Sequence, residues 1–272
     1  MPELPEVETI KNSLSAKISN KFIIGFNNFL SKIIQPELKV FRENILNSRI
    51  QSISRIGKYL FIYLNNQQVL VIHLRMTGQL LIVNKDLLPD KHTLVEFYFQ
   101  DSSEKLIYRD IRRFGQIKLI LEKDLLAYLA SKKLAPDALL IQKETFIQNL
   151  TKRNMLIKTA LLDQSIIAGI GNIYADEILF QAKILPNRRT NSLSASELDL
   201  LFTSIQQVLT LAIKNRGTSI SDYVDANNQK GSNQNFLKVY KQEGKKCHNC
   251  GNLIQRIKIN GRSTRYCTHC QT

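Results

Sequence analysis

The sequence predicts an α+β fold, with a β-rich N-terminal part followed by helices and a small cysteine module. Short apolar runs separated by turn-rich pieces fill residues 20–120, whereas residues 122–220 show apolar residues at helical spacing. All four cysteines lie within the last 26 of the 272 residues. Hydrophobic residues make up 43% of the chain, which is enough for two domains, each with its own core.

The first element that we expect is a short helix over residues 5–14. Pro5 suits a first-turn position, and the acidic Glu6 and Glu8 suit the positive end of a helix dipole. Apolar residues follow at helical spacing, namely Leu4, Val7, Ile10 and Leu14.

Strands are predicted next, in a β-sandwich or a barrel-like domain. The runs that predict them are YLFIYL (59–64), QVLVIHL (68–74), QLLIV (79–83), TLVEFYF (93–99) and QIKLIL (116–121). Amphipathic helices are then predicted from KDLLAYLA (123–130), QNLTKRNMLIKTALLD (148–163), NIYADEILFQAKI (172–184) and ASELDLLFTSIQQVLTLAIKN (195–215). Residues 217–234 are polar and predict a flexible loop.

The cysteine module predicts one structural Zn²⁺. Two CxxC knuckles, Cys247/Cys250 and Cys267/Cys270, are separated by sixteen residues and can place four thiolates around one ion. A pair of redox CxxC motifs is the alternative, and the adjacent histidines, His248 and His269, are read as ordinary exposed residues.

Between the knuckles, Asn260-Gly261 predicts a two-residue β-hairpin turn. The basic residues around it fit a DNA-contacting finger, although a knuckle that only stabilises the C-terminus fits equally: Arg256, Lys258, Arg262 and Arg265.

A formal net charge of +15 favours a nucleic-acid partner. Anionic membranes would also attract such a charge, but no basic amphipathic helix stands out. The start of the chain lacks a targeting signal, and the most apolar run, 69–74, is too short to cross a bilayer. We therefore expect a cytoplasmic protein.

The N-terminus is a candidate catalytic group. Proline at position 2 permits removal of Met1, which would leave a secondary amine that is partly neutral at physiological pH. Such an amine can attack a sugar C1′ and form an iminium ion, with Glu3 as a general acid or base and Glu6 holding the first turn. The alternative interpretation is that PELPE is only the start of a helix.

Seven motifs in order resemble the formamidopyrimidine-DNA glycosylase (Fpg) family of bacterial type, over essentially the whole chain. They are PELPEVET (2–9), GKYL (57–60), HLRMTGQL (73–80), DKH (90–92), DIRRFG (110–115), AGIGNIYADE (168–177) and GRSTRYC (261–267) with the terminal CxxC. The resemblance implies a catalytic β-sandwich domain with an N-terminal helix over 1–125 and a linker with the start of the helical domain over 126–150. It also implies a helix–two-turn–helix domain over 151–235 with a lesion loop at 217–234, and a four-cysteine zinc-finger hairpin over 236–272.

The activity that the resemblance implies is that of a bifunctional glycosylase and AP lyase, which removes oxidised purines (8-oxoguanine, formamidopyrimidines) from double-stranded DNA. Pro2 would attack C1′ and Glu3 would assist proton transfer at the sugar. Lys58 would donate a proton in β-elimination, and Arg262 would act in δ-elimination. Without the resemblance, Lys58 and Arg262 would be read as solvated surface charges.

Residues that contact DNA are implied in the same way. Met76, Arg112 and Phe114 match positions that fill the gap left by a flipped nucleotide. Without the resemblance, Met76 and Phe114 would be read as core residues. Further DNA contacts are implied at His92, Arg112 and Arg153. Asn172 after two glycines at a helix start, and Lys158 on the preceding helix, are phosphate candidates, and a solvated helix face is the alternative for Lys158.

The sequence departs from the family pattern at three places. Ile111 stands where the family usually has proline, Arg153 where it often has lysine, and the 217–234 loop diverges most. We expect a monomer in the nucleoid, with no protein partner and no membrane. Two alternatives remain, an endonuclease VIII-like enzyme for oxidised pyrimidines and a non-enzymatic zinc-finger protein that binds damaged DNA.

Overall fold

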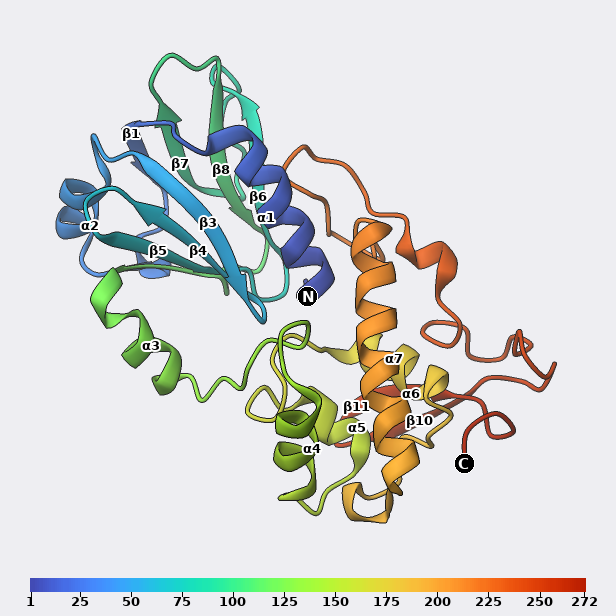
Figure 1. The fold of residues 1–272 in the computed structure, drawn as a ribbon. Coiled ribbons are helices and arrows are strands. Elements are labelled where there is room, and N and C mark those ends of the chain that lie inside the picture. The colour runs from blue at the N-terminus through green and yellow to red at the C-terminus, as the bar shows by residue number, and fades with distance from the viewer. The chain divides into compact units, whose positions relative to one another are not determined.

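The computed structural model describes all residues from Met1 to Thr272, and the chain divides into two compact units. Unit 1 comprises Met1–Lys132 and Arg216–Ser232, and unit 2 comprises Lys133–Asn215 and Asn233–Thr272. Segment 216–232 therefore packs with the N-terminal part, although it follows the longest helix of unit 2 in the chain. Figure 1 labels most helices and strands of both units.

Unit 1 is a sandwich of two sheets. The four-stranded sheet has the order β1-β7-β8-β6, formed by Ile23–Asn28, Thr93–Phe99, Glu104–Asp110 and Gly78–Asn84. The five-stranded sheet has the order β2-β9-β5-β4-β3, formed by Ile34–Gln35, Gln116–Leu121, Gln68–His73, Tyr59–Leu64 and Ile50–Ile56. All pairs are antiparallel except β2 with β9. Buried side chains from both sheets, such as Leu80 and Ile62, form one core, so the sandwich interpretation is confirmed over the barrel.

Three helices belong to unit 1. α1 (Leu4–Ile18) buries one apolar stripe in the sandwich core and extends beyond the predicted residue 14, because Ile18 continues that stripe. α2 (Leu38–Ile45) adds Phe41 and Ile45 to the same core. A 3₁₀ turn, η2 (Glu122–Asp124), leads into α3 (Leu125–Ser131), which packs on Phe61 and its neighbours on the other face of the five-stranded sheet.

Unit 2 contains the remaining helices and a hairpin. The helices are α4 (Lys143–Thr151), α5 (Ile157–Leu162), α6 (Asn172–Gln181) and α7 (Ala195–Lys214). α7 starts with a capping box, in which the Ser194 hydroxyl accepts the Glu197 N–H and the Glu197 carboxylate accepts the Ser194 N–H at 2.7 Å. β10 (Gln255–Ile259) and β11 (Arg262–Tyr266) form the predicted hairpin, with positive φ at Asn260 and Gly261. Three further 3₁₀ turns are present, one in unit 1 at Ser31–Ile33 and two in unit 2 at Thr190–Ser192 and Asn233–Phe236.

The prediction of one helix over 148–163 is wrong. The chain leaves the helix after Thr151 and starts a new one at Ile157, because its backbone pairs with a distant segment instead. Leu156 forms a β-bridge with Arg189, and the Ile157 N–H donates to the Arg188 carbonyl at 2.8 Å. Apolar spacing alone cannot distinguish one helix from two helices whose apolar faces share a core.

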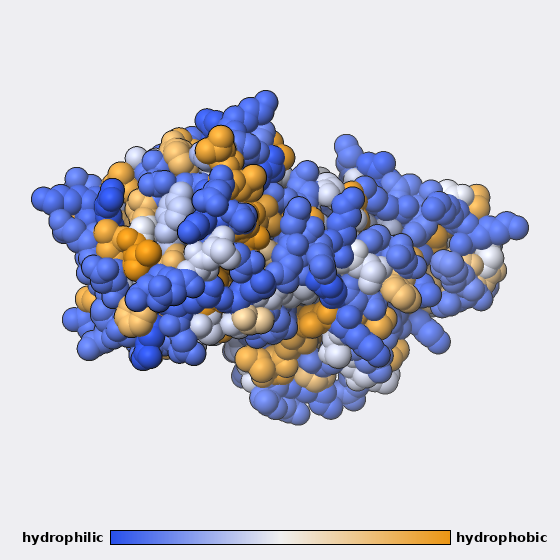
Figure 2. Space-filling view, turned by 90° about the horizontal axis from the view of Figure 1, so that it is seen from above, coloured by the Kyte–Doolittle hydropathy of each residue, from blue (hydrophilic) through white to orange (hydrophobic).

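None of the helices combines the length and apolar character needed to span a membrane. Hydrophilic residues cover most of the face seen in Figure 2, with small hydrophobic groups between them.

Candidate catalytic and DNA-contacting residues

The N-terminal residues are held in place by the carboxylate of Glu6. One of its oxygens accepts the Glu3 N–H at 2.8 Å and the other accepts the Thr218 N–H at 2.7 Å. Pro2 and Glu3 are buried, so neither lies on a freely solvated helix start. Glu6 thus joins the first turn of α1 to segment 216–232.

Segment 216–232 requires glycine where it passes Glu6. Gly217 has φ +77°, and a Cβ there would lie 2.9 Å from a carboxylate oxygen of Glu6. The Tyr223 hydroxyl donates to the Arg216 carbonyl at 3.0 Å, and the Ala226 N–H donates to the Ser13 hydroxyl at 3.2 Å. The segment has little regular structure, as predicted, but the bonds to Glu6 and Ser13 tie it to α1.

Lys58 lies in the turn between β3 and β4, close to α1. The Arg55 guanidinium bonds Glu8 of α1 at 2.7 Å and the Gly57 carbonyl at 2.9 Å, which fixes this turn against the helix. Burial alone would raise the pKa of Glu8, but bonds from Lys11 and Arg55 lower it. Lys58 is only 8% exposed, so its interpretation as a solvated surface charge is wrong.

Two loops of unit 1, residues 75–77 and 111–115, form what we call the two-loop ridge, which is exposed at residues 75–76 and 111–114. The buried carboxylate of Asp110 joins them, because it accepts the Thr77 hydroxyl at 2.5 Å and the Gly115 N–H at 2.8 Å. Met76 is 42% exposed and Phe114 is 54% exposed, which contradicts their alternative interpretation as core residues. The Arg112 guanidinium stacks over the Phe114 ring, with its central carbon 4.8 Å from the ring centroid.

Two histidines of unit 1 flank this ridge. His73, which the sequence reasoning missed, accepts the Arg75 N–H on Nδ1 at 3.0 Å and thereby holds the positive φ of Arg75. Burial, followed by the charge of Arg75, lowers the pKa of His73 to about 3. His92 is half-buried with an unpartnered Nδ1, and its carbonyl accepts the Asp110 N–H at 2.9 Å. The sequence does not single out His73, because its hydrogen-bond partner is a backbone N–H, which every residue except proline has.

In unit 2, Asn172 is the first residue of α6, as predicted. Gly171 precedes it as the N-cap, and Gly169 has φ +112°. The Asn172 amide donates to the Ser263 carbonyl at 3.1 Å, while its buried Oδ1 has no hydrogen-bond partner. Arg153 is exposed in the turn after α4.

The expectation that Lys158 offers its ammonium to a phosphate needs correction. Its side chain is wholly buried and bonds Asp176 at 2.6 Å, the Thr264 hydroxyl at 2.8 Å and the Ser263 carbonyl at 3.1 Å. Asp176 also accepts the Arg265 N–H at 3.1 Å. Lys158 and Asp176 therefore anchor β11, the strand that begins with Arg262, to α5 and α6.

The four cysteines converge in unit 2. Their Sγ atoms all lie within 4.8 Å of one another, whereas tetrahedral Zn–S bonds of about 2.3 Å place thiolates about 3.8 Å apart. The donor set thus fits a tetrahedral ion that prefers sulfur. His248 and His269 are exposed, as predicted, and Arg262 is exposed beside the hairpin turn.

Comparisons with known proteins match every part of this arrangement. Three family models match the chain: "Formamidopyrimidine-DNA glycosylase N-terminal domain" at residues 1–117, "Formamidopyrimidine-DNA glycosylase H2TH domain" at 134–224 and "Zinc finger found in FPG and IleRS" at 244–272. The chain is 44% identical over 272 residues to the formamidopyrimidine-DNA glycosylase of Carboxydothermus hydrogenoformans, covering 100% of both chains. The chain belongs to the formamidopyrimidine-DNA glycosylase family.

Other members of the Fpg family give the same result. The enzyme of Desulforamulus reducens is 42% identical over 275 residues, covering 100% of this chain and 99% of that protein. Two Lactococcus lactis Fpg structures, a mutant in complex with Fapy-dG DNA and a complex with abasic-site DNA, superpose with TM-scores of 0.94 and 0.93. Each is 38% identical and covers 99% of both chains. The α+β fold, with its helix–two-turn–helix and four-cysteine elements, is thereby confirmed.

Proposed function

We propose that this chain is a bifunctional DNA glycosylase and AP lyase of base excision repair, acting on double-stranded DNA that contains oxidised purines. The observation that carries the proposal is the full-length similarity to enzymes whose structures hold Fapy-dG and abasic-site DNA. The substrates that we assign are formamidopyrimidines and 8-oxoguanine. The charge of +15 suits the polyanionic partner.

The proposed nucleophile is the secondary amine of Pro2, which removal of Met1 would free. Its nitrogen forms a bond to C1′ as the glycosidic bond breaks, and the base departs with the bonding electron pair and takes up a proton. The attached nitrogen loses its N–H proton, so that its lone pair can form the C=N bond when the C1′–O4′ bond breaks. Glu3 then donates a proton to the ring oxygen O4′ as the sugar opens to an iminium ion. Glu6 acts as a positioning residue, since it holds the Glu3 backbone at 2.8 Å.

Strand cleavage follows from the acidity that the iminium confers on C2′. Loss of a C2′ proton breaks the C3′–O3′ bond, and a second elimination breaks the C5′–O5′ bond. We assign proton donation in the first elimination to Lys58, whose burial suits a fixed ammonium, and a role in the second to Arg262.

The two-loop ridge is proposed to fill the gap that the flipped nucleotide leaves, through Met76, Arg112 and Phe114. The exposure of Met76 and Phe114 supports this role, because it leaves both apolar side chains accessible to a base stack. We assign further DNA contacts to His92, Arg153 and Asn172. The protein is proposed to hold one Zn²⁺ in the four thiolates and to act as a monomer in the bacterial cytoplasm, at the nucleoid.

The test is borohydride trapping with a duplex carrying 8-oxoguanine opposite cytosine, or a formamidopyrimidine in its place. The reductant converts the iminium into a stable adduct, which we expect to map to Pro2 and to be absent from Pro2→Gly. Intact-mass analysis that found Met1 retained in active protein would exclude the amine mechanism. An adduct only with oxidised pyrimidines would favour the endonuclease VIII-like alternative, and binding without any adduct would overturn the proposal.

A further inference from the structure

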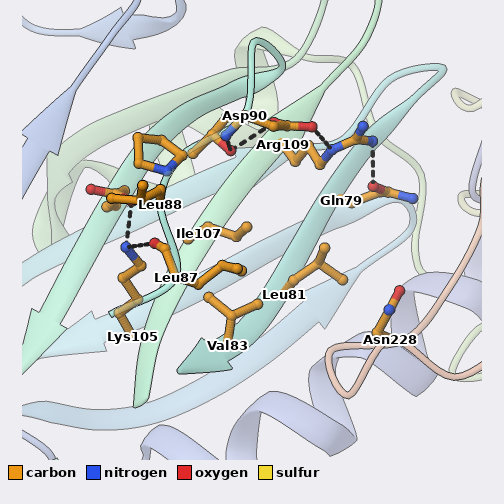
Figure 3. Close-up of a pocket in the computed structure, with 13 residues that line it drawn as sticks. Gln79, Leu81, Val83, Leu87, Leu88, Asp90, Lys105, Ile107, Arg109 and Asn228 are labelled. Atoms are coloured by element: carbon orange, nitrogen blue, oxygen red, sulfur yellow. Dashed lines mark hydrogen bonds and ion pairs between the residues drawn. The ribbon is translucent and has the colours of Figure 1, made fainter. Parts of the chain in front are cut away.

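A pocket of about 400 Å³ lies in unit 1 on the outward face of β6, β8 and β7, away from the sandwich core. Leu81, Val83 and Ile107 form its floor (Figure 3), because they alternate along their strands with residues that face the core. The loop after β6 borders one side, through Leu87 and its neighbours, and segment 216–232 borders another, through Asn228. The volume lies in the range of sites for small molecules.

The charges in this pocket are already paired. At one end the Lys105 ammonium bonds the Glu96 carboxylate at 2.7 Å and the Leu87 carbonyl at 2.7 Å. At the other end the Arg109 guanidinium bonds Asp90 at 2.9 Å. A charged ligand would find no unpaired counter-charge among these side chains. The pocket therefore selects an uncharged ligand with a flat apolar face that can lie on the floor.

Asn228 is an exposed residue of the lining and offers a polar group to a ligand. The other polar side chains of the lining are engaged with protein partners, as Gln79 is with Arg109 at 3.3 Å, whereas the Asn228 side-chain amide makes no hydrogen bond. Figure 3 shows it projecting from its loop beside the sheet. A carboxamide offers one acceptor and two donors, which matches the paired N–H and C=O of a cyclic lactam.

We propose that this pocket binds an uncharged planar heterocycle with a lactam edge, the chemical class of purine and pyrimidine lactam bases. A bound ligand should also change the amide environment of segment 216–232, because β6 is hydrogen-bonded to it. The Ile82 N–H donates to the Ala226 carbonyl at 2.8 Å, and Gln79 donates to the Asp222 carbonyl. The site lies within unit 1 and does not depend on the proposed glycosylase reaction, so its failure would leave the trapping result untouched.

The test is a titration of the ¹⁵N-labelled, zinc-loaded full chain with hypoxanthine, followed by amide chemical shifts. We expect saturable shifts in β6, β8, the loop at 84–92 and residues 222–229. Unsubstituted purine, which has the same rings without the lactam, should bind at least about fivefold more weakly, the value of one hydrogen bond of about 1 kcal/mol. Orotate, an anionic lactam, should give no saturable shift at these residues.

Three variants locate the site. Val83→Phe fills the floor and should abolish the shifts, while Val40→Phe, at an exposed position of α2, should leave them unchanged. Asn228→Asp keeps a residue that tolerates the φ of +60° but removes the donor, and it should weaken hypoxanthine at least about fivefold. The proposal is overturned if shifts are absent at these residues, if they persist in Val83→Phe with a native-like spectrum, or if Asn228→Asp binds as tightly as the parent.

Discussion

At the scale of single residues, each unit contains a buried ion pair. These pairs are Lys105 with Glu96 in unit 1 and Lys158 with Asp176 in unit 2. Removing one partner of such a pair leaves an uncompensated charge without water. Lys158→Met should therefore lower the free energy of unfolding by about 3–5 kcal/mol in urea denaturation of the zinc-loaded protein. The matched control is the exposed Lys152, where the same change should have little effect. Equal effects at the two positions would contradict this assignment.

His73 predicts a pH dependence of stability. Its pKa is held near 3 by burial, whereas an unfolded histidine titrates near 6.5. Below pH 6.5 the unfolded state binds the proton and the folded state does not, so stability present above pH 6.5 is lost as the pH falls towards 3. Between pH 7 and pH 5 the parent should lose about 2 kcal/mol that His73→Gln does not lose. Parallel pH profiles in the two proteins would refute a neutral buried His73.

At the scale of elements, a change in the two-loop ridge should lower DNA affinity without lowering the stability of the fold. Phe114→Ala should leave the unfolding free energy within about 0.5 kcal/mol of the parent, because the ring is 54% exposed. The same change should weaken binding to a duplex with an abasic-site analogue by about 1–3 kcal/mol, the range for one lost base–aromatic contact. Fluorescence anisotropy measures this loss. Phe29→Ala, at a similarly exposed ring of unit 1, serves as the control and should retain parental affinity.

The elements also show where sequence patterns suffice. β4, β7 and β9 begin and end at the predicted residues, because turn residues bound each of these short apolar runs and so fix its length. The break at 152–156 was not predictable, since it depends on pairing with residues 188–190 far along the chain. The same limit explains Lys158, whose partners lie on α6 and β11. By contrast, the cysteine cluster depends on spacing within one short module, and the sequence predicted all four members.

At the scale of the whole molecule, the sandwich and the cysteine module are supported by different means. Unit 1 has a large sandwich core, whereas the cysteine module has a small one, formed by Val239, Ile254 and a few neighbours around the thiols. In a module this small, metal binding to four thiolates supplies a large part of the folding free energy. We therefore expect the module to depend on the metal that we propose for the four cysteines, together with contacts to the helices such as the Lys158–Asp176 anchor on β11.

Removal of zinc should consequently unfold one part of the chain. After dialysis against a strong chelator, we expect trypsin to cut within residues 244–272 first, at basic residues that include Arg256 and Lys258, while unit 1 resists. DNA cleavage should fall with the loss of metal and return when Zn²⁺ is restored, because the hairpin that carries Arg262 would no longer be held. Metal analysis must confirm the loss. A metal-free chain that stayed resistant at 244–272 would show that the surrounding hydrogen bonds, rather than the ion, maintain the hairpin.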